Sequence, residues 1–209
     1  RGMMQSDPRL QYVLLAAGSR ENDLINFRNE RARFMFNFGA GGGAMLLQRG
    51  ASHNHILGAS AITDGSLSES VILTEAAVGA EQPIVGELRG RLDVTDPDFM
   101  AERLGAVSLT NFVRVIRESV EVGGASLSDL AFLGITHMKR SFYLQILESV
   151  GLTADQSVYL EDYGHVQSVD QVLALELGLA QGKIKPGDLI VLAGAGTGYT
   201  WSAVALRWG

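Results

Sequence analysis

The pattern of apolar and polar positions divides the chain into short apolar runs and one long amphipathic stretch. Apolar residues recur every three or four positions over residues 98–122, which predicts a helix, and residues 95–98 supply an N-cap and an early proline. Two shorter helices are expected at 139–149 and 168–180. Strands are expected at 12–18, 44–47, 55–62, 70–74, 130–135, 158–160, 189–193 and 201–208.

The order of these elements favours one fold class. Strands alternate with helices and return as short apolar runs, and the run 12–18 is typical of a strand buried on both faces of a sheet. The sequence therefore predicts an α/β fold with a mostly parallel sheet. Ligands in such folds lie at the carboxyl ends of the strands, so residues that follow a strand are the first candidates for chemistry.

Composition and charge remove several classes of function. The chain contains no cysteine, so these 209 residues supply no disulfide, cysteine-ligated metal or thiol nucleophile. The 17 Lys and Arg residues against 23 Asp and Glu residues give a net charge of −6, which argues against a nucleic-acid partner or an anionic membrane surface. No apolar run is long enough to span a membrane. We expect a soluble cytoplasmic protein without a metal site.

Two histidines stand where strands are predicted to end. His137 follows the strand at 130–135, and His165 follows a glycine after the short strand at 158–160. Two imidazoles at such ends can reach a common ligand and act as hydrogen-bond donors to an oxyanion or as general acid and base. The alternative is that each one only stabilises the fold with hydrogen bonds.

Two glycine-rich segments look similar to nucleotide-binding motifs. The first begins at Gly39 and the second at Gly194, and each is followed by a short apolar strand. The dinucleotide fingerprint needs a helix after the glycines, because the helix N-terminus holds the pyrophosphate. We therefore expect these glycines to permit close backbone approach or to present N–H groups to a ligand.

Several segments together resemble a known family. The run from Gly182 to Trp208, Tyr163-Gly164 with the helix after it, the step from a strand to His137, and the cluster at 38–44 are similar to β-ketoacyl-acyl-carrier-protein synthase III enzymes of the thiolase-like superfamily. The similarity runs in order from about residue 12 to residue 208, and its most specific part is the C-terminal run.

The resemblance implies a fold of two similar βαβαβ-type halves. Residues 1–50 are then a remnant of the N-terminal half, and residues 51–209 form the C-terminal half. Members of the family are longer than this chain, so Arg1 is expected to fall in the helix that follows a nucleophilic cysteine. On this interpretation the chain is a fragment that is inactive by itself, and the full-length protein is a homodimer.

The resemblance also implies an activity, the decarboxylative condensation of a malonyl thioester with an acyl thioester. No bound cofactor is expected, because CoA or phosphopantetheine thioesters are the substrates, and acyl-CoA or acyl carrier protein is the partner. His137 matches the family's catalytic histidine, which donates a hydrogen bond to the thioester oxygen. A backbone N–H in the last glycine turn, at Thr197, is expected to form a further oxyanion hole and makes Thr197 a catalytic position, and Gly196 and Gly198 beside it are expected to bind substrate.

Three departures from the family pattern bear on this activity. His165 stands where the family has an asparagine donor, although a neutral imidazole can still donate one N–H. Thr197 stands where glycine is usual, which adds a side chain beside the acyl site. Met138, Lys139 and Arg140 replace Gln-Ala-Asn, so the two cations either contact phosphate or an acidic carrier protein or form the solvated start of a helix.

Two alternative functions fit the same residues. One is acyl transfer to an alcohol or amine without decarboxylation, with His165 as the general base. The other is a non-catalytic partner subunit that keeps only the fold. Release of carbon dioxide separates the first alternative from condensation, and the presence of an upstream cysteine bears on the second.

Overall fold

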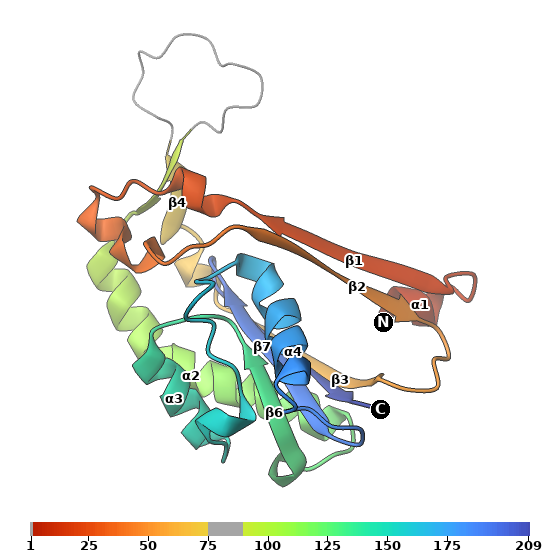
Figure 1. Ribbon diagram of the computed structural model, residues 1–209. Helices are drawn as coiled ribbons and strands as arrows, with labels where there is room; N and C mark the ends of the chain where they lie inside the picture. The colour runs from red at the N-terminus through yellow and green to blue at the C-terminus, as the bar shows by residue number, and fades with distance from the viewer. Residues whose placement is uncertain (1, 75–89) are drawn as a thin grey trace.

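The centre of the molecule is a four-stranded sheet (Figure 1). The computed structural model describes residues 2–74 and 90–209. The strands run in the order β3 (His55–Thr63), β8 (Thr200–Arg207), β7 (Leu189–Gly196) and β6 (Leu130–Ile135). Only β6 and β7 pair in parallel, and β7–β8 and β3–β8 are antiparallel. The prediction of a mostly parallel sheet is therefore wrong, because the short glycine turn between β7 and β8 allows only an antiparallel pair.

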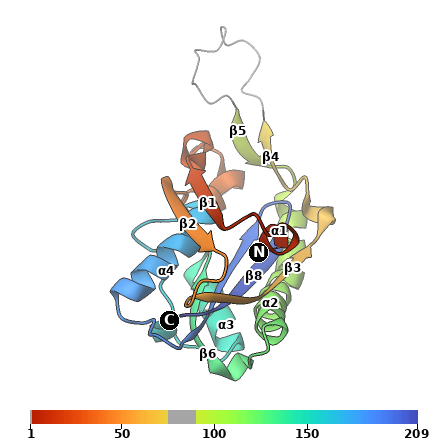
Figure 2. The ribbon, with the colours of Figure 1, turned by 90° about the vertical axis from the view of Figure 1, so that its right-hand side faces the viewer.

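Helices cover both faces of this sheet, and α2 and α4 lie on opposite sides of it (Figure 2). On one face, α2 (Pro97–Val122) and α3 (Arg140–Ser149) pack against Leu133 and Val191 in the larger apolar core. On the other face, α4 (Asp170–Ala180) packs with Phe132 and Ile190. Successive residues of β6 and β7 thus enter different cores, because side chains alternate across a strand.

The three predicted helices are confirmed, with ends that differ by one or two residues. The first begins as predicted, since the side chain of Asp96 accepts a hydrogen bond of 2.9 Å from the N–H of Phe99. Short 3-10 turns complete the helical structure: η1 (Glu21–Leu24), η2 (Glu30–Met35), η3 (Gly65–Leu67), η4 (Leu127–Asp129), η5 (Ala154–Gln156) and η6 (Gln167–Val169). Among the described residues no helix has both the length and the apolar character needed to cross a membrane.

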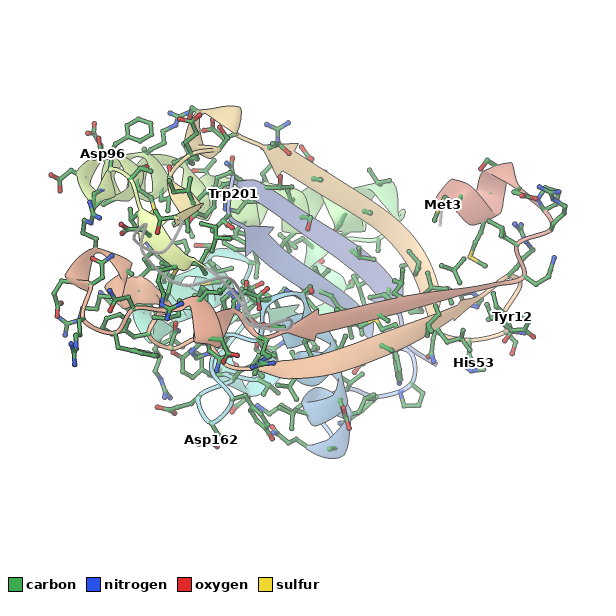
Figure 3. The ribbon with its side chains drawn as sticks, turned by 90° about the horizontal axis from the view of Figure 1, so that it is seen from above. Met3, Tyr12, His53, Asp96, Asp162 and Trp201 are labelled. Atoms are coloured by element: carbon green, nitrogen blue, oxygen red, sulfur yellow. The ribbon has the colours of Figure 1, made fainter. Side chains whose placement is uncertain are left out.

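A long antiparallel ribbon lies beside the sheet, and Figure 3 shows it from above. It consists of β1 (Tyr12–Ser19) and β2 (Gly41–Gln48), paired from Tyr12 with Gln48 to Ser19 with Gly41, and α1 (Gly2–Ser6) precedes it. The prediction that the first strand is buried on both faces is wrong for the described residues, because Leu14 is 65% exposed and Leu15 49% exposed. The ribbon is apolar in sequence, yet large apolar side chains on it are exposed in the structure.

Other predicted strands also differ from the structure. Strand β4 (Val71–Thr74) pairs with β5 (Arg91–Val94), which was not predicted. Residues 158–160 form no strand; the residue before them, Ser157, forms a bridge with Leu133 and its Oγ also donates to the carbonyl of Leu133. The predicted boundary near residue 50 falls in the loop between β2 and β3.

Candidate active site

His137 lies just beyond the carboxyl end of β6. Thr136 extends the pairing of this strand, since its N–H donates to the carbonyl of Ala193 at 3.1 Å. The N–H of His137 then turns to the start of α4, where it donates to Oδ2 of Asp170 at 2.7 Å. The backbone of His137 is therefore fixed between the central sheet and α4.

His165 is positioned by the chain that leads into the ribbon. Its N–H donates to the carbonyl of Asn37 at 2.8 Å, and its carbonyl accepts from the N–H of Gly39 at 2.9 Å. Its ring meets the ring of Phe38 edge-on, with centroids 5.1 Å apart. The sequence predicted a strand before His165, but the structure replaces that strand with this contact between residues far apart in the chain.

Asp170 joins the two histidines. It is the first residue of α4, its side chain is fully buried, and its carboxylate lies within hydrogen-bond distance of three nitrogen atoms. Oδ2 accepts from the N–H of His137 at 2.7 Å and lies 2.6 Å from Nδ1 of His165, while Oδ1 accepts from the N–H of Val166 at 2.7 Å. Analysis of the sequence missed this residue, although an acidic side chain in the first turn of a predicted helix is a recognisable signal.

The ring of His137 lies in a different environment from that of His165. It stacks at a tilt on the ring of Tyr159, with centroids 4.9 Å apart. Its Nδ1 is buried and has no hydrogen-bond partner among the described residues. Burial lowers the pKa of His137, and the opposing effect of the Asp170 charge is smaller. His137 is therefore a neutral imidazole at pH 7.

A cavity of about 690 Å³ opens beside His165, between the ribbon and the sheet. Its walls are mostly apolar, with residues of β1, β2, β7 and β8, and its polar groups include Thr136, His165 and Gln171. Gln171, another residue that the sequence did not single out, donates to Oγ1 of Thr136 at 2.7 Å and to the carbonyl of Ala193 at 3.0 Å. An apolar chamber with few polar groups at one end is the usual form of a site for a small ligand.

Of the other predicted site residues, one lines the cavity and the rest lie outside it. Gly196 lines the cavity, whereas Thr197 and Gly198 lie in the turn after β7 and outside its lining. Lys139 and Arg140 are exposed at the start of α3. Arg140 contacts Glu161 at 3.2 Å and lies over the ring of Tyr159, 5.2 Å from its centroid. The structure thus joins His137 and His165 through Asp170 and leaves both cations outside the cavity.

Comparison with protein families matches the chain in two parts. Residues 1–65 match the family described as 3-Oxoacyl-[acyl-carrier-protein (ACP)] synthase III. Residues 120–208 match the family described as 3-Oxoacyl-[acyl-carrier-protein (ACP)] synthase III C terminal. The two matches follow the order of the chain and together cover most of it.

Curated relatives carry the same description. The chain is 28% identical over 183 residues to beta-ketoacyl-[acyl-carrier-protein] synthase III of Microcystis aeruginosa, covering 87% of this chain and 54% of that protein. It is 28% identical over 204 residues to the enzyme of that name from Synechocystis, covering 95% of this chain and 59% of that protein. The chain therefore spans little more than half the length of these relatives.

Solved structures of synthase III proteins share the fold. The protein from Thermus thermophilus superposes with a TM-score of 0.79 at 22% identity, over 100% of this chain and 62% of that one. The protein from Aquifex aeolicus gives a TM-score of 0.78 at 22% identity, over 99% of this chain and 61% of that one. The predicted thiolase-like α/β fold is thus confirmed. With both family matches in order along this fold, the chain belongs to the 3-oxoacyl-[acyl-carrier-protein] synthase III family.

Proposed function

We propose that the protein to which these residues belong is a condensing acyltransferase, and that this chain carries the histidine side of its active site. The reaction joins a malonyl thioester to an acyl thioester with loss of carbon dioxide. The observation that carries the proposal is the pair of histidine segments held on one buried carboxylate, Asp170, with His165 lining an apolar cavity and His137 directly after Thr136 of its wall. The 209 residues contain no cysteine, so a thiol nucleophile has to come from outside them.

His137 is suited to donate a hydrogen bond in this reaction. Loss of carbon dioxide from a malonyl thioester leaves an enolate, whose negative charge collects on the thioester oxygen. Because burial lowers the pKa of His137, its ring is neutral, and a neutral imidazole carries one N–H that can donate to that oxygen. Its fixed backbone and its contact with Tyr159 hold the ring in place before the charge develops.

The substrates we propose are thioesters of CoA or of an acyl carrier protein, and these take the place of a resident cofactor. The largely apolar walls of the cavity suit an acyl chain. Lys139 is exposed and has no side-chain hydrogen bond or ion pair in the described part of the chain, so it is free to meet a phosphate or an acidic carrier. A homodimeric assembly and a cytoplasmic location are the expectations that accompany this function.

The test is an assay of the complete open reading frame that contains these residues. Release of carbon dioxide from a malonyl thioester is measured for the protein and for His137→Ala and His165→Ala. Removal of one oxyanion donor costs about a hundredfold or more in rate, so His137→Ala is expected to lose at least that much, and His165→Ala tests whether the second histidine is also required. His53→Ala is the matched control, because His53 is exposed and, within residues 2–74 and 90–209, Ser52 is the one hydrogen-bond partner of its side chain.

Two outcomes contradict the proposal. If both variants keep the rate within about twofold, the histidines are not oxyanion donors. If acyl transfer proceeds with no carbon dioxide from the malonyl thioester, the reaction is plain acyl transfer rather than condensation.

A further inference from the structure

We propose that Asp170 is a positioning residue that fixes His165 in one tautomer, with the proton on Nδ1 and an unprotonated Nε2 available to the cavity. The role of this tautomer in acyl transfer rests on the function proposed above, but the tautomer itself does not. It follows from hydrogen bonds within the described chain.

One proton lies between the carboxylate of Asp170 and the ring of His165, and the other bonds of Asp170 decide which atom holds it. Asp170 already accepts the N–H groups of His137 and Val166, one on each carboxylate oxygen, and both bonds are 2.7 Å. A carboxylate whose oxygens both accept hydrogen bonds is an acceptor and not a donor in this network. The 2.6 Å contact between Oδ2 and Nδ1 of His165 therefore requires the proton to lie on the imidazole nitrogen.

The ring of His165 is held in place by its surroundings. The backbone of His165 is bonded on both sides to the segment that enters β2, and its ring meets Phe38. Asp170 is itself held at the first position of α4 and is fully buried. Asp170 cannot turn away without losing all three of its contacts, and the ring of His165 cannot turn away without losing its bond to Asp170 and its contact with Phe38, so the proton on Nδ1 is fixed by the fold and not by the ligand.

With the proton on Nδ1, the second ring nitrogen of His165, Nε2, is unprotonated. In a neutral imidazole one nitrogen carries the proton and the other accepts hydrogen bonds. Nε2 of His165 has no hydrogen-bond partner in the described residues, its side chain is 15% exposed, and the ring lines the cavity. The group presented to a ligand is thus a proton acceptor, whereas the amide of an asparagine at this position offers an N–H.

This tautomer gives His165 a defined role. An S–H or O–H group bound at Nε2 can pass its proton to that nitrogen, which leaves a thiolate or alkoxide and an imidazolium, with no change in oxidation state. The carboxylate of Asp170 stabilises the imidazolium. His165 donates a hydrogen bond to an oxyanion only in this protonated form, whereas His137 can donate one as a neutral ring.

The experiment measures the tautomer directly, without substrate. Long-range ¹H–¹⁵N correlation spectra distinguish the two neutral tautomers, and the chain has only four histidines to assign. At a pH of about 8, where unperturbed histidines are neutral, we expect the Nδ1–H tautomer at His165 with a strongly deshielded Nδ1 proton. His165→Asn assigns the signal by its disappearance, and His53 and His55 serve as controls in the same spectrum. An Nε2–H tautomer at His165 overturns the proposal.

Variants of Asp170 test the cause. Asp170→Ala removes the acceptor, so His165 is expected to shift towards the Nε2–H tautomer. If this variant fails to fold, Asp170→Asn keeps the shape and removes the charge, and the deshielded proton is expected to move upfield. An unchanged His165 signal in the folded variant shows that Asp170 only stabilises the structure. Because no turnover is involved, failure of this test and failure of the condensation assay can be told apart.

Discussion

The segments that carry His137 and His165 use the same carboxylate in different ways. Asp170 binds the backbone of His137 and leaves its ring against Tyr159, whereas it binds the ring of His165 directly. Burial therefore decides the charge of His137, and a hydrogen bond decides the proton position in His165. Two residues of one type can hold different roles in one site, because the neighbours of the ring set its chemistry.

The two segments also depend on different parts of the fold. The His137 segment continues β6, an edge strand of the central sheet whose residues are almost entirely buried. The His165 segment has no strand of its own and is held by Asn37 and Gly39 near the start of the ribbon. The first position is a consequence of the C-terminal sheet, and the second needs contact with the N-terminal part of the chain.

Removal of the shared carboxylate is expected to have the largest effect. Asp170→Ala leaves two backbone N–H groups and one imidazole N–H without an acceptor in a buried place, so the free energy of unfolding should fall by about 3–5 kcal/mol. Urea unfolding measures this change. Asp162→Ala is the control, because Asp162 is exposed, and its effect should stay within about 0.5 kcal/mol. Equal effects of the two substitutions would show that Asp170 does not join the segments.

A methyl group at Gly164 should separate the His165 segment from the ribbon. Gly164 has a φ of +69°, and a Cβ there would lie 2.3 Å from the carbonyl oxygen of Asn37. Strain and overlap together are expected to cost about 3 kcal/mol in Gly164→Ala. Gly151 has a similar φ of +79° with nothing within 4 Å of such a Cβ.

Gly151→Ala is therefore the matched control, with an expected cost of about 1 kcal/mol from strain alone. Both values come from urea unfolding. A Gly164→Ala variant no less stable than Gly151→Ala would mean that the contact with Asn37 does not hold the His165 segment.

The smallest expected effect is a pH dependence that belongs to His137. Burial lowers its pKa in the folded chain, while the unfolded chain titrates near the ordinary value of about 6.5. Between these two values the unfolded state binds more protons, so the free energy of unfolding falls as the pH drops through about 6.5 and levels off below the folded pKa. Urea unfolding from about pH 7.5 to about pH 5 measures this in the protein and in His137→Gln.

The difference between these two proteins isolates the histidine, because the other groups titrate in both. The stability of the unmodified chain relative to His137→Gln should decrease towards acid pH. A constant difference across this range would show that the ring of His137 is not desolvated, and the contrast with His165 would then fail.

The sequence by itself determined the elements whose pattern is local. The periodicity of α2, its cap at Asp96 and the apolar run of β6 placed these elements to within one or two residues. The family motifs then supplied the thiolase-like fold and drew attention to His137 and His165. Helix periodicity and caps depend on residues close together in the chain, so one sequence is enough to recognise them.

Only the tertiary structure decided the pairing of strands and the partners of the histidines. Antiparallel pairing of β3 and β8, exposure of the ribbon and the contact of His165 with Asn37 join residues far apart in the chain. In the sequence, Asp170 is an acidic residue in the first turn of a predicted helix, and only the structure shows that it is buried between both histidine segments. The spacing of apolar residues along the chain indicates which helix or strand a side chain belongs to. Its chemistry depends on burial and hydrogen-bond geometry, because these arise only when distant segments pack together.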